Sequence, residues 1–519
     1  MILFGSCNKE QNKPTSNGKT LRIAMAGNPT SFDPHQARGL LASTLMPMMF
    51  EGLTRLNEKG EAVPAVAEDV SISEDGLTYI FSLRNCQWSN GDPVTAYDFE
   101  YAWKRVLSPS FPAPYAFRLF FIAGAKAAKN GDIAIDDIGV AALDANTLAV
   151  HLETPTPQFL EHLSFHAYFP INRAWDQEHP NWAKDSEEMF VGNGPFLITR
   201  PGQDQLNMLK NPLYWDADTV QLDAIEMISV DDNTAQQLFE NGDLDWVGSP
   251  MGTITQDAII ALKDDPAFKT CPAAGTQFFR FNTRLEPFDN IKFRKAFSFA
   301  LNRQDIVDHI LQAGQKPALA LVPPTMGVAN HAFFTDNDSK KARELFEEGL
   351  EEMGWTRETM PKIALTYFKN DRYHKVAQAV QQQFLQVLGI NVVLRQKESK
   401  IVYDMLQNGD YQFAIGSWFA DINDPTNFLE VFKNADNGTN NTGWENPQYI
   451  SYLNDAIWTD DDHTRSELYY KAEKLLMEEM PIAPINYFTF VYLSRPHVKG
   501  VMFSQLGFLD FKNASVEVR

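Results

Sequence analysis

Apolar residues alternate with polar or small residues in several short stretches of the chain, and this period of two predicts half-buried β-strands. The predicted strands cover residues 20–26, 76–83, 147–152, 243–247, 390–394 and 410–416. Three of them are followed closely by Pro29, Pro155 and Gly248, residue types that terminate strands and open turns. Sheet segments are therefore expected along most of the chain.

Other stretches repeat their apolar residues at intervals of three and four, which predicts amphipathic helices with one buried face. The predicted helices cover residues 40–50, 95–106, 234–240, 293–301, 302–314, 376–388 and 401–406. Thr95 and Asn302 stand at helix starts with an aspartate three residues later, as in a capping box. Pro47 is expected to interrupt the first helix, and Gln383 departs from the apolar face of the sixth.

The order helix, Asn-Gly-Asp, strand occurs twice, at residues 234–247 and 401–416. Each copy ends in a loop of small residues, so the repeat suggests two α/β domains whose loops point at a shared cleft. Glycine ends helices in many contexts, and that capping chemistry alone explains part of the likeness. Residues 480–487, with two prolines, are predicted to cross stiffly between domains.

Asp421 lies in the predicted loop just past the strand at 410–416, close to Trp418. Asp424 and Pro425 then start a helix as an N-cap residue and a first-turn proline. In open α/β sheets the ligand binds beyond the carboxyl ends of the strands, which makes Asp421 a candidate ligand-binding residue. The alternative is an ordinary solvated aspartate in a β-to-α loop.

Length, charge and aromatic content narrow the class of protein. A chain of 519 residues is too long for a single hydrophobic core and predicts two or three domains. The net charge is −22, from 45 basic and 67 acidic residues, and no Lys/Arg run could neutralise phosphates, so nucleic acid is not an expected partner. The 10 Trp, 16 Tyr and 37 Phe are enough to line a large apolar ligand cleft, although most of them are expected in the core.

The three cysteines are Cys7, Cys86 and Cys271, and no Cys-x-x-Cys pair supports zinc or redox chemistry. Whether Cys86 and Cys271 pair stays open, with single buried thiols favoured. Residues 1–7 end in a box similar to a bacterial lipoprotein cleavage site, which predicts a lipidated Cys7 and a polar tether through residue 19. A frayed terminus explains the same residues equally well. No apolar run is long enough to span a bilayer.

No enzyme motif is recognisable in the chain. It has no Gly-x-Ser-x-Gly elbow, no P-loop, no His-Glu-x-x-His and no Gly-x-Gly-x-x-Gly after a strand. The ten histidines lack the spacing of metal ligands. Asp421 and Asp424 are too weak a pair to favour glycoside hydrolysis. We therefore expect a binding protein without a cofactor or metal rather than an enzyme.

Several motifs together resemble the signature of the peptide-type (family 5) solute-binding proteins of ABC importers. The matching segments are residues 31–35, 50–53, 75–84, 88–99, 193–196, 281–282 and 288–303. Residues 417–425, Ser-Trp-Phe-Ala-Asp-Ile-Asn-Asp-Pro, resemble the oligopeptide-binding branch in particular. The resemblance covers nearly the whole chain from Thr20.

The resemblance implies an α/β fold of the periplasmic-binding-protein-like type II class with three lobes. The implied ranges are residues 20–48, 172–273 and 487–519 for lobe I, the inserted residues 49–171 for lobe II, residues 274–486 for lobe III, and residues 1–19 for a signal remnant or lipoprotein tether. Lobe III carries Asp421. The ligand would lie between lobes I and III, which close by a hinge.

The family residues that match this sequence imply a peptide site. Asp421 would hold the α-ammonium of the peptide, and the peptide backbone would pair with the protein as an added strand. The other implied ligand-binding residues are Ser417, Trp418, Phe419, Arg38, Gly39, Leu40, Tyr115, Gly248, Ser249 and, at the carboxylate end of the ligand, His374.

The sequence departs from the family pattern at four positions. Arg38 stands where the oligopeptide binders have an acid, and Ile415 and Leu406 stand where they have arginines for the far end of the ligand. Phe419 replaces a cysteine, so the bridge that the family makes to Cys271 cannot form. The ammonium anchor is thus kept and the carboxylate end altered. Our hypothesis is that Arg38 helps to neutralise a ligand carboxylate, and the alternative is a solvated surface arginine.

The predicted function is that of an extracytoplasmic receptor, a monomer in the periplasm or cell envelope, which passes short peptides to an ABC permease. It would touch the membrane only through the lipid anchor. A receptor for murein peptides is the nearest alternative, because branched or D-configured ends suit an altered carboxylate pocket. A hydrolase acting in the cleft and a nickel or haem carrier on the same fold are further alternatives.

Overall fold

A computed structural model of the chain describes residues 19–517, except residues 30, 184–189, 203, 327–330, 437 and 460. The predicted lipidation site Cys7 and nearly all of its tether lie outside the described residues. None of the helices in the described part of the chain is both long and apolar enough to cross a membrane.

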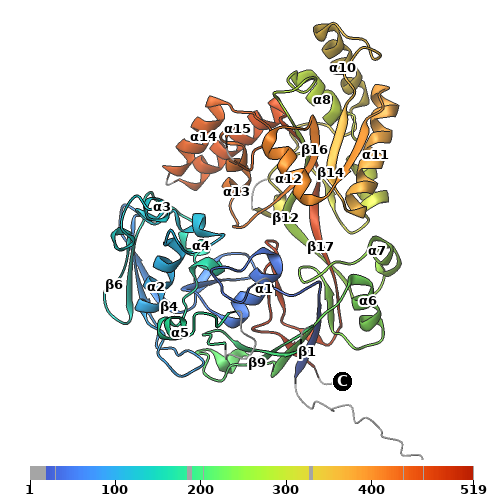
Figure 1. Cartoon of the computed structure of the whole chain (residues 1–519). Coiled ribbons are helices and arrows are strands. Elements are labelled where there is room, and N and C mark those ends of the chain that lie inside the picture. Colours follow the sequence, from blue (N-terminus) through green and yellow to red (C-terminus); the bar gives the residue numbers. More distant parts are fainter. Residues whose placement is uncertain are drawn as a thin grey trace, which may run out of the picture.

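A central sheet of eleven strands runs through the part of the chain that the structure describes (Figure 1). Its strands are β1 (Thr20–Met25), β8 (Phe196–Gly202), β9 (Gln205–Lys210), β10 (Ala224–Ser229), β11 (Trp246–Gly248), β12 (Phe268–Phe281), β13 (Lys316–Pro317), β14 (Ala364–Phe368), β15 (Val393–Lys397), β16 (Phe413–Phe419) and β17 (Ile482–Ser494). The order is β15-β14-β16-β12-β17-β11-β1-β10-β9-β8, with β13 paired to β17.

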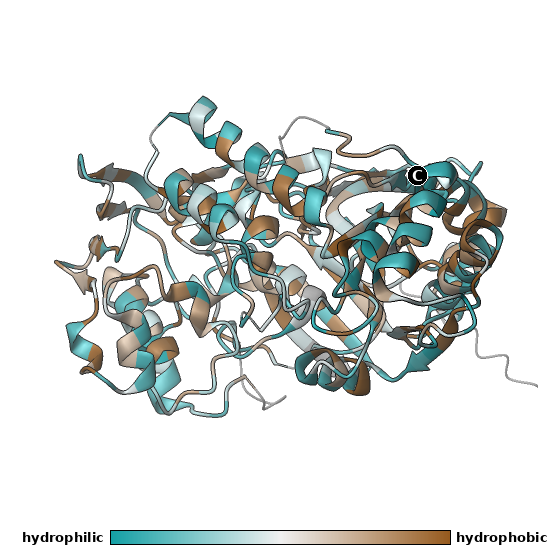
Figure 2. Ribbon diagram, turned by 90° about the horizontal axis from the view of Figure 1, so that it is seen from above, coloured by the Kyte–Doolittle hydropathy of each residue, from teal (hydrophilic) through white to brown (hydrophobic). Residues whose placement is uncertain are grey.

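Smaller sheets and the helices surround the central sheet. The remaining strands are β2 (Thr54–Leu56), β3 (Ala62–Pro64), β4 (Ala67–Ile72), β5 (Thr78–Leu83), β6 (Val140–Ala142), β7 (Thr147–His151), β18 (Val498–Lys499), β19 (Met502–Phe503), β20 (Leu509–Asp510) and β21 (Ser515–Val516). The α-helices are α1 (Gly39–Met49), α2 (Ala96–Leu107), α3 (Ala125–Asn130), α4 (Phe159–His162), α5 (Arg173–Glu178), α6 (Asp232–Glu240), α7 (Gln256–Leu262), α8 (Ile291–Phe299), α9 (Arg303–Asp305), α10 (Ser339–Met353), α11 (Asp371–Leu388), α12 (Ser399–Asn408), α13 (Thr426–Leu429), α14 (Pro447–Ile457) and α15 (Asp462–Glu479). Figure 2 shows hydrophobic and hydrophilic stretches alternating along the helices, as expected where one face of each packs inward.

The long strands β12 and β17 connect the two halves of the molecule. β17 pairs with β11 near its end and with β12 along most of its length, and Figure 1 shows it passing from the upper body to the lower one. The ladder between them shifts register between Pro272 and Thr276. The lobe boundaries that we predicted at 273/274 and 486/487 fall within these two strands. Lobes I and III, whose assignment stays a prediction, would thus share one sheet.

The strand predicted at 410–416 is present as β16, with different ends. It begins later than expected and runs on through Ser417, Trp418 and Phe419, which we expected in the following loop. The cause is β12, which pairs with β16 along the whole length of that strand. The strands predicted at 390–394 and 243–247 also begin later than expected, as β15 and β11. Pairing with neighbouring strands, and not local alternation alone, therefore sets these ends.

Pro47 does not interrupt the first helix, contrary to expectation. It lies inside α1, which continues past it to Met49, although proline has no N–H to donate to the carbonyl of Ser43. Gln383, the polar residue on the apolar face of α11, has a partner in the backbone of Asn302. The Gln383 side chain accepts a hydrogen bond from Asn302 N at 3.0 Å and donates one to Asn302 O at 3.2 Å. This exchange joins α11 to the start of α9.

The four-stranded sheet β4-β5-β7-β6 packs with α2 in the region predicted as lobe II. The capping interaction predicted for α2 is present, since the Asp98 carboxylate accepts hydrogen bonds from the Thr95 backbone N–H at 2.8 Å and from the Thr95 hydroxyl at 3.0 Å. Trp88 and Trp103 are buried in a core cluster that continues into β1, β10 and α1. The regions predicted as lobes I and II therefore share one core.

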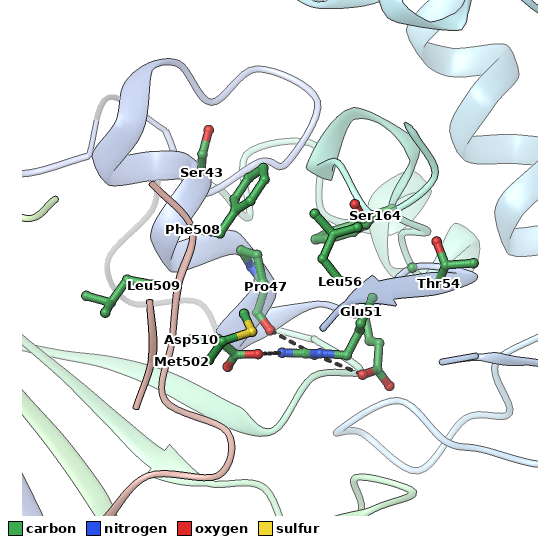
Figure 3. A pocket seen from close by; sticks show the side chains of 13 residues that line it. Ser43, Pro47, Glu51, Thr54, Leu56, Ser164, Met502, Phe508, Leu509 and Asp510 are labelled. Atoms are coloured by element: carbon green, nitrogen blue, oxygen red, sulfur yellow. Dashed lines mark hydrogen bonds and ion pairs between the residues drawn. The ribbon is translucent and has the colours of Figure 1, made fainter. Parts of the chain in front are cut away.

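A small cavity of about 40 Å³ lies where the C-terminal segment packs against α1 and β2 (Figure 3). In its wall, Arg55 donates hydrogen bonds to Glu51 at 2.8 Å and to Asp510 at 2.6 Å. The Tyr214 hydroxyl donates to the same Glu51 carboxylate at 2.7 Å. Because Glu51 is fully buried, its pairing with Arg55 is needed to offset the loss of solvation. The network fixes the last strands of the chain beside the first helix.

Candidate functional site

β16 has one edge that is largely free of strand partners. β14 pairs with β16 only at its first two residues, Phe413 and Ala414, whereas β12 pairs with it throughout. Among the described strands, none covers the second edge of β16 from Ile415 to Phe419. Such an edge offers backbone donors and acceptors to an extended peptide.

Asp421 lies just beyond the end of β16. Its backbone N–H donates to Asn427 Oδ1 at 3.2 Å, and the same oxygen accepts a hydrogen bond from Trp418 Nε1 at 3.0 Å. The following turn is held by Asp424, whose carboxylate accepts from Thr426 N at 2.8 Å. These bonds fix the backbone of the loop and leave the Asp421 side chain 47 % exposed. The carboxylate is thus held in place and accessible.

A buried arginine from another part of the chain reaches Asp421. Arg118 Nη2 lies 2.7 Å from Asp421 Oδ2, although only 5 % of the Arg118 side chain is exposed. The guanidinium carbon lies 4.0 Å from the centre of the Phe165 ring, and Nε has no hydrogen-bond partner among the described residues. In our assignment Arg118 belongs to lobe II and Asp421 to lobe III. The ion pair therefore joins these two parts of the molecule.

A cavity of about 700 Å³ lies beside the ion pair. One wall comes from residues 117–162 and the other mainly from residues 418–469, which include Trp418 and Asp421. This volume is within the range of small-ligand sites. His162 in the wall is buried, and burial lowers its pKa to about 3, so that its ring is neutral at physiological pH. The cavity is large enough for a small ligand and opens on the Asp421 carboxylate.

The residues predicted in the first lobe come together with Tyr115. The Tyr115 hydroxyl accepts a hydrogen bond from Gly39 N at 3.3 Å, and the centre of its ring lies 5.8 Å from the Arg118 guanidinium carbon. Arg38 is the exposed residue that precedes α1, and Leu40 follows in that helix. Gly39, Tyr115 and Arg118 thus form a line of contacts that leads to the ion pair.

Gly248 and Ser249 pack against β17. The Ser249 N–H donates to Val491 O at 2.9 Å, and the Val491 N–H donates to Ser249 Oγ at 3.4 Å. Gly248 has a φ of +101°, and a Cβ at this position would lie 2.7 Å from Val491 O. The close approach to β17 therefore accounts for glycine at this position.

Phe419 packs flat against the sheet beside the end of β16. Its ring stacks on Phe488, with 4.6 Å between ring centroids and 28° between planes. The ring covers Gly275, where an added Cβ would lie 2.6 Å from a ring carbon. Cys271, to which the family bridges this position, is paired in the sheet with Phe490. Aromatic packing occupies the place of that bridge.

Ser417 and His374 lie where α11 begins beside β16. The Tyr373 hydroxyl is 3.4 Å from Ser417 Oγ, which places the first turn of α11 beside the strand. His374 Nδ1 is 2.7 Å from the Tyr367 hydroxyl. One ring nitrogen of His374, the residue expected at the carboxylate end of the ligand, therefore has a partner within the protein.

The two positions where the family has arginines lie in apolar clusters. Ile415 is fully buried among residues that include Phe279 and Phe384, and Leu406 is buried with Val402. A guanidinium at either position would need a hydrogen-bonded partner to offset its desolvation. Packing therefore explains the apolar residues, and the ligand must find another cation if its carboxylate is held.

The part of the chain that the structure describes contains two cysteines, which do not form a disulfide, and no metal-binding cluster. Cys86 and Cys271, whose pairing we left open, are both free thiols. Burial raises the pKa of Cys86 to about 12. No group of three or more His, Cys, Asp and Glu in this part of the chain is placed to hold a metal ion.

The sequence analysis did not predict three residues that lie near the site: Arg118, Asn427 and Arg372. Arg118 lies in a short 3₁₀ segment, Ala116–Leu119, and nothing in the neighbouring residues indicates its distant partner. Asn427 and Arg372 stand in the first turns of α13 and α11. Polar residues at helix starts after strands are a usable signal, because ligands bind at that end of an α/β sheet.

Comparison with known proteins finds similar chains over nearly the whole length of this one. A family model described as "Bacterial extracellular solute-binding proteins, family 5 Middle" matches residues 61–440. The oligopeptide-binding protein OppA of Bacillus subtilis (strain 168) is 40% identical over 518 residues, which cover 98% of this chain and 95% of that protein. The dipeptide-binding protein DppE of the same organism is 38% identical over 509 residues, with 96% and 92% covered. The solved structure of the Escherichia coli murein tripeptide binding protein MppA has a TM-score of 0.78 at 30% identity and covers 96% of this chain and 99% of that one.

Proposed function

The chain belongs to family 5 of the bacterial extracellular solute-binding proteins, and from this premise we propose that it captures short peptides between its lobes and passes them to the permease of an ABC importer. The family and the type II periplasmic-binding-protein-like α/β fold agree with what the sequence motifs implied. Its relatives are substrate-binding proteins and not enzymes. We accordingly propose capture without turnover, which recovery of intact peptide after incubation would test.

The observation that carries the proposal is the free edge of β16 next to Asp421. In our proposal an extended peptide pairs its backbone with residues 415–419, and its α-ammonium binds the Asp421 carboxylate. Backbone pairing is independent of side-chain identity, which suits a receptor for varied peptides. The exposed carboxylate just beyond the strand end then selects a free amino terminus.

Arg118 competes with the peptide ammonium for the Asp421 carboxylate. It pairs with one oxygen of Asp421, so a bound ammonium shares the carboxylate with a guanidinium or displaces it. Two cations at one carboxylate repel each other, and the repulsion is strongest where solvent is excluded. We propose that peptide binding weakens the Arg118–Asp421 contact and so couples ligand capture to the position of the lobe II residues.

Calorimetric titration with alanine peptides of two to six residues tests the proposal. We expect saturable binding of at least one length, no binding of free alanine or maltose, and weaker binding of the N-acetylated peptides. A failure to bind any peptide, by protein that is stripped of co-purified ligand and verified as folded, would contradict the function.

A receptor for murein peptides is the second candidate. It is favoured by the likeness to MppA and by the two apolar positions, Ile415 and Leu406, at which the family has arginines. Mass spectrometry of ligand that co-purifies with the protein separates the candidates. Murein peptides would carry diaminopimelate or D-alanine, and ordinary peptides would not.

The family places the chain outside the cytoplasm. We further propose that Cys7 carries a lipid anchor, that the protein is a monomer and that the ABC permease is its partner. Metabolic labelling with a fatty acid, compared between the natural protein and Cys7→Ala, tests the anchor. Light scattering of the soluble part tests the oligomeric state.

A further inference from the structure

Arg280 on β12 is a buried cation without an acidic partner. The residue is 7 % exposed, and Nε has no hydrogen-bond partner among the described residues. Burial lowers the pKa of the guanidinium, and the groups near enough to act on its charge are the side chains of Tyr373, Tyr403 and Tyr411, with no carboxylate among them. The guanidinium carbon lies 5.4 Å from the centre of the Phe278 ring. Rings and phenols do not neutralise a buried charge, so the charge of Arg280 is left uncompensated.

Arg280 differs in this respect from the other buried arginines in the described part of the chain. Their partners are Asp421 for Arg118, the backbone carbonyl of Glu479 for Arg294, and Asp336 for Arg303. Each of these partners lies within hydrogen-bonding distance of the guanidinium that it serves. A buried cation that lacks such a partner destabilises the fold, so its presence points to an anion that comes from outside the chain.

The guanidinium of Arg280 lies over the free edge of β16. In the ladder between β12 and β16, Arg280 pairs with Ala414 and Phe278 pairs with Gly416. Paired residues of neighbouring strands project from the same face of a sheet, so these four residues share one face. A Cβ built on Gly416 would lie 3.4 Å from Arg280 Nε. Because Gly416 has no side chain, nothing on that residue stands between the guanidinium and a strand added at the free edge.

We propose that Arg280 binds the carboxylate of an acidic side chain in the captured peptide, so that the protein prefers peptides with an acidic residue at a defined position. This inference rests on the proposed function and names the peptides that the site favours. A peptide that pairs with β16 lies in the plane of the sheet, and its side chains project alternately from the two faces. A guanidinium that stands over one face therefore meets a side chain of the peptide and not its backbone.

The spacing of the strands favours glutamate at this position. Neighbouring strands lie about 4.8 Å apart, so β12 and the added strand are separated by roughly 10 Å with β16 between them. The long side chains of arginine and glutamate together bridge this distance across Ala414 and Gly416, two of the smallest residues of β16. A planar guanidinium can hold the carboxylate through two parallel hydrogen bonds.

The other arginines near the edge are less suited to this role. Arg118 already contacts Asp421. The guanidinium carbon of Arg372 lies 5.1 Å from the centre of the Phe488 ring, which stacks on Phe419 at the end of the strand. Arg372 is also half-buried, so water compensates its charge in part. The need for an external anion is therefore greatest at Arg280.

Alanine pentapeptide amides with one glutamate at the second, third, fourth or fifth position are the probes, and the same peptides with glutamine are their controls. The amide removes the terminal carboxylate, so the side chain supplies the carboxylate of the ligand. Calorimetry should show about tenfold tighter binding for glutamate than for glutamine at one position, or at two positions two residues apart. The positions on either side should show a ratio of about one, because their side chains project from the opposite face.

Arg280→Gln and Arg280→Met should lower the ratio to about one at every position, with binding of the glutamine peptides unchanged. Arg280→Lys should keep part of the preference, because the charge returns without the planar fork. The melting temperature of ligand-free Arg280→Met should equal or exceed that of the natural protein, because an apolar side chain replaces an unpaired buried charge. If Arg280→Gln and Arg280→Met both fail to fold, the charge is compensated within the protein, and the inference is overturned.

Arg372→Gln is the matched control and should keep the preference for glutamate. A preference that survives in Arg280→Gln, or that is lost in Arg372→Gln instead, overturns the assignment to Arg280. Equal binding of glutamate and glutamine peptides by the natural protein at all four positions overturns it as well, and leaves peptide capture intact. Penta-alanine as free acid and as amide separates the two sources of a carboxylate: a ratio that falls in Arg280→Gln would assign Arg280 to the chain terminus and overturn the side-chain preference. If the natural protein binds none of these probes nor any other peptide, both this inference and the proposed function fail.

Discussion

Arg118 Nη2 lies 2.7 Å from Asp421 Oδ2, so a buried cation of the region predicted as lobe II contacts the carboxylate that we assign to the peptide ammonium. The two side chains differ in exposure, 5% against 47%, and Asp421 is the partner that solvent and ligand can reach. The pair thus makes Asp421 both a contact between parts of the protein and a candidate ligand site. Replacing each partner separates these two roles.

Asp421→Asn should weaken the binding of peptides with a free amino terminus by about tenfold or more. The amide keeps the size of the side chain and removes the charge that pairs with an ammonium. Calorimetry should show little change for N-acetylated peptides, which lack the ammonium. Equal losses for both kinds of peptide would mean that Asp421 supports the loop and does not bind the ammonium. Asp424→Asn, which alters the neighbouring capping carboxylate, is the control for damage to the loop.

Arg118→Gln should strengthen the binding of peptides with a free amino terminus, by about three- to tenfold. The substitution removes a cation that competes for Asp421, and a partly buried pair of this kind is worth about 1 kcal/mol. N-acetylated peptides should bind as they do to the natural protein. Weaker binding of the free-amino peptides would show instead that Arg118 orients the carboxylate. A double substitution with Asp421→Asn should abolish the gain, because the two side chains act on each other.

The position of Asp421 just past a strand could be predicted because its signal is local, while its role in ligand binding stays a prediction. An alternating strand, a loop and a capped helix follow one another in a few residues, and a carboxylate in that loop lies at the ligand end of the sheet. β12 gave no such signal, since its residues from Ala273 to Phe281 are all buried. A strand covered on both faces has no polar alternation to detect. Most residues of β17 are also buried, so the alternation of polar and apolar residues could not predict the sheet that β12 and β17 share.

Arg118 and Arg372 could not be predicted for a different reason. Their roles depend on which distant residues the fold brings to them, and neither partner is close in sequence. The capping interaction of Thr95 with Asp98, by contrast, lies within one helical turn and was predicted correctly. Hydrogen bonds within one helical turn can thus be predicted from the sequence, while ion pairs between residues far apart in the chain cannot.

Gly275→Ala should displace the Phe419 ring from Phe488. A Cβ at Gly275 would lie 2.6 Å and 2.7 Å from two Phe419 ring carbons, which is closer than any carbon contact allows. We expect a loss of about 1–3 kcal/mol in stability, as for other overpacked sites, together with weaker peptide binding at the disturbed strand end. Thermal unfolding and calorimetry measure the two effects.

Two variants control this prediction. Gly252→Ala should be nearly neutral, because the nearest heavy atom to its Cβ would lie at 3.4 Å. Phe419→Ala should remove most of the added cost of Gly275→Ala, since the clash needs both side chains. Additive losses in the double variant would show that the ring is not the obstacle.

Glu473→Gln should make the stability of the protein less dependent on pH. Glu473 lies in α15, is 5% exposed, and accepts hydrogen bonds from Leu321 N at 2.8 Å and Val322 N at 2.7 Å. Burial raises its pKa from 4.5 to about 7. The folded protein therefore takes up a proton that the unfolded chain releases between these pH values. The stability that Glu473 contributes in protonated form is fully present below pH 4.5 and is lost as pH rises through 7.

The midpoints of thermal or urea unfolding, measured from pH 4.5 to pH 8, test this prediction. At the acidic end the free energy of unfolding of the variant should equal that of the natural protein. At the basic end it should be larger by up to about 3 kcal/mol, because an amide keeps an acceptor oxygen without a buried charge. Glu478→Gln, on the same helix but 59% exposed, should leave the pH dependence as it is. A difference between the Glu473 variant and the natural protein that stays constant with pH would show that Glu473 is not protonated on folding. If the stability of the variant relative to the natural protein falls as pH rises, the ionised form of Glu473 is the stabilising one. Its charge is then satisfied by the two backbone donors of residues 321 and 322.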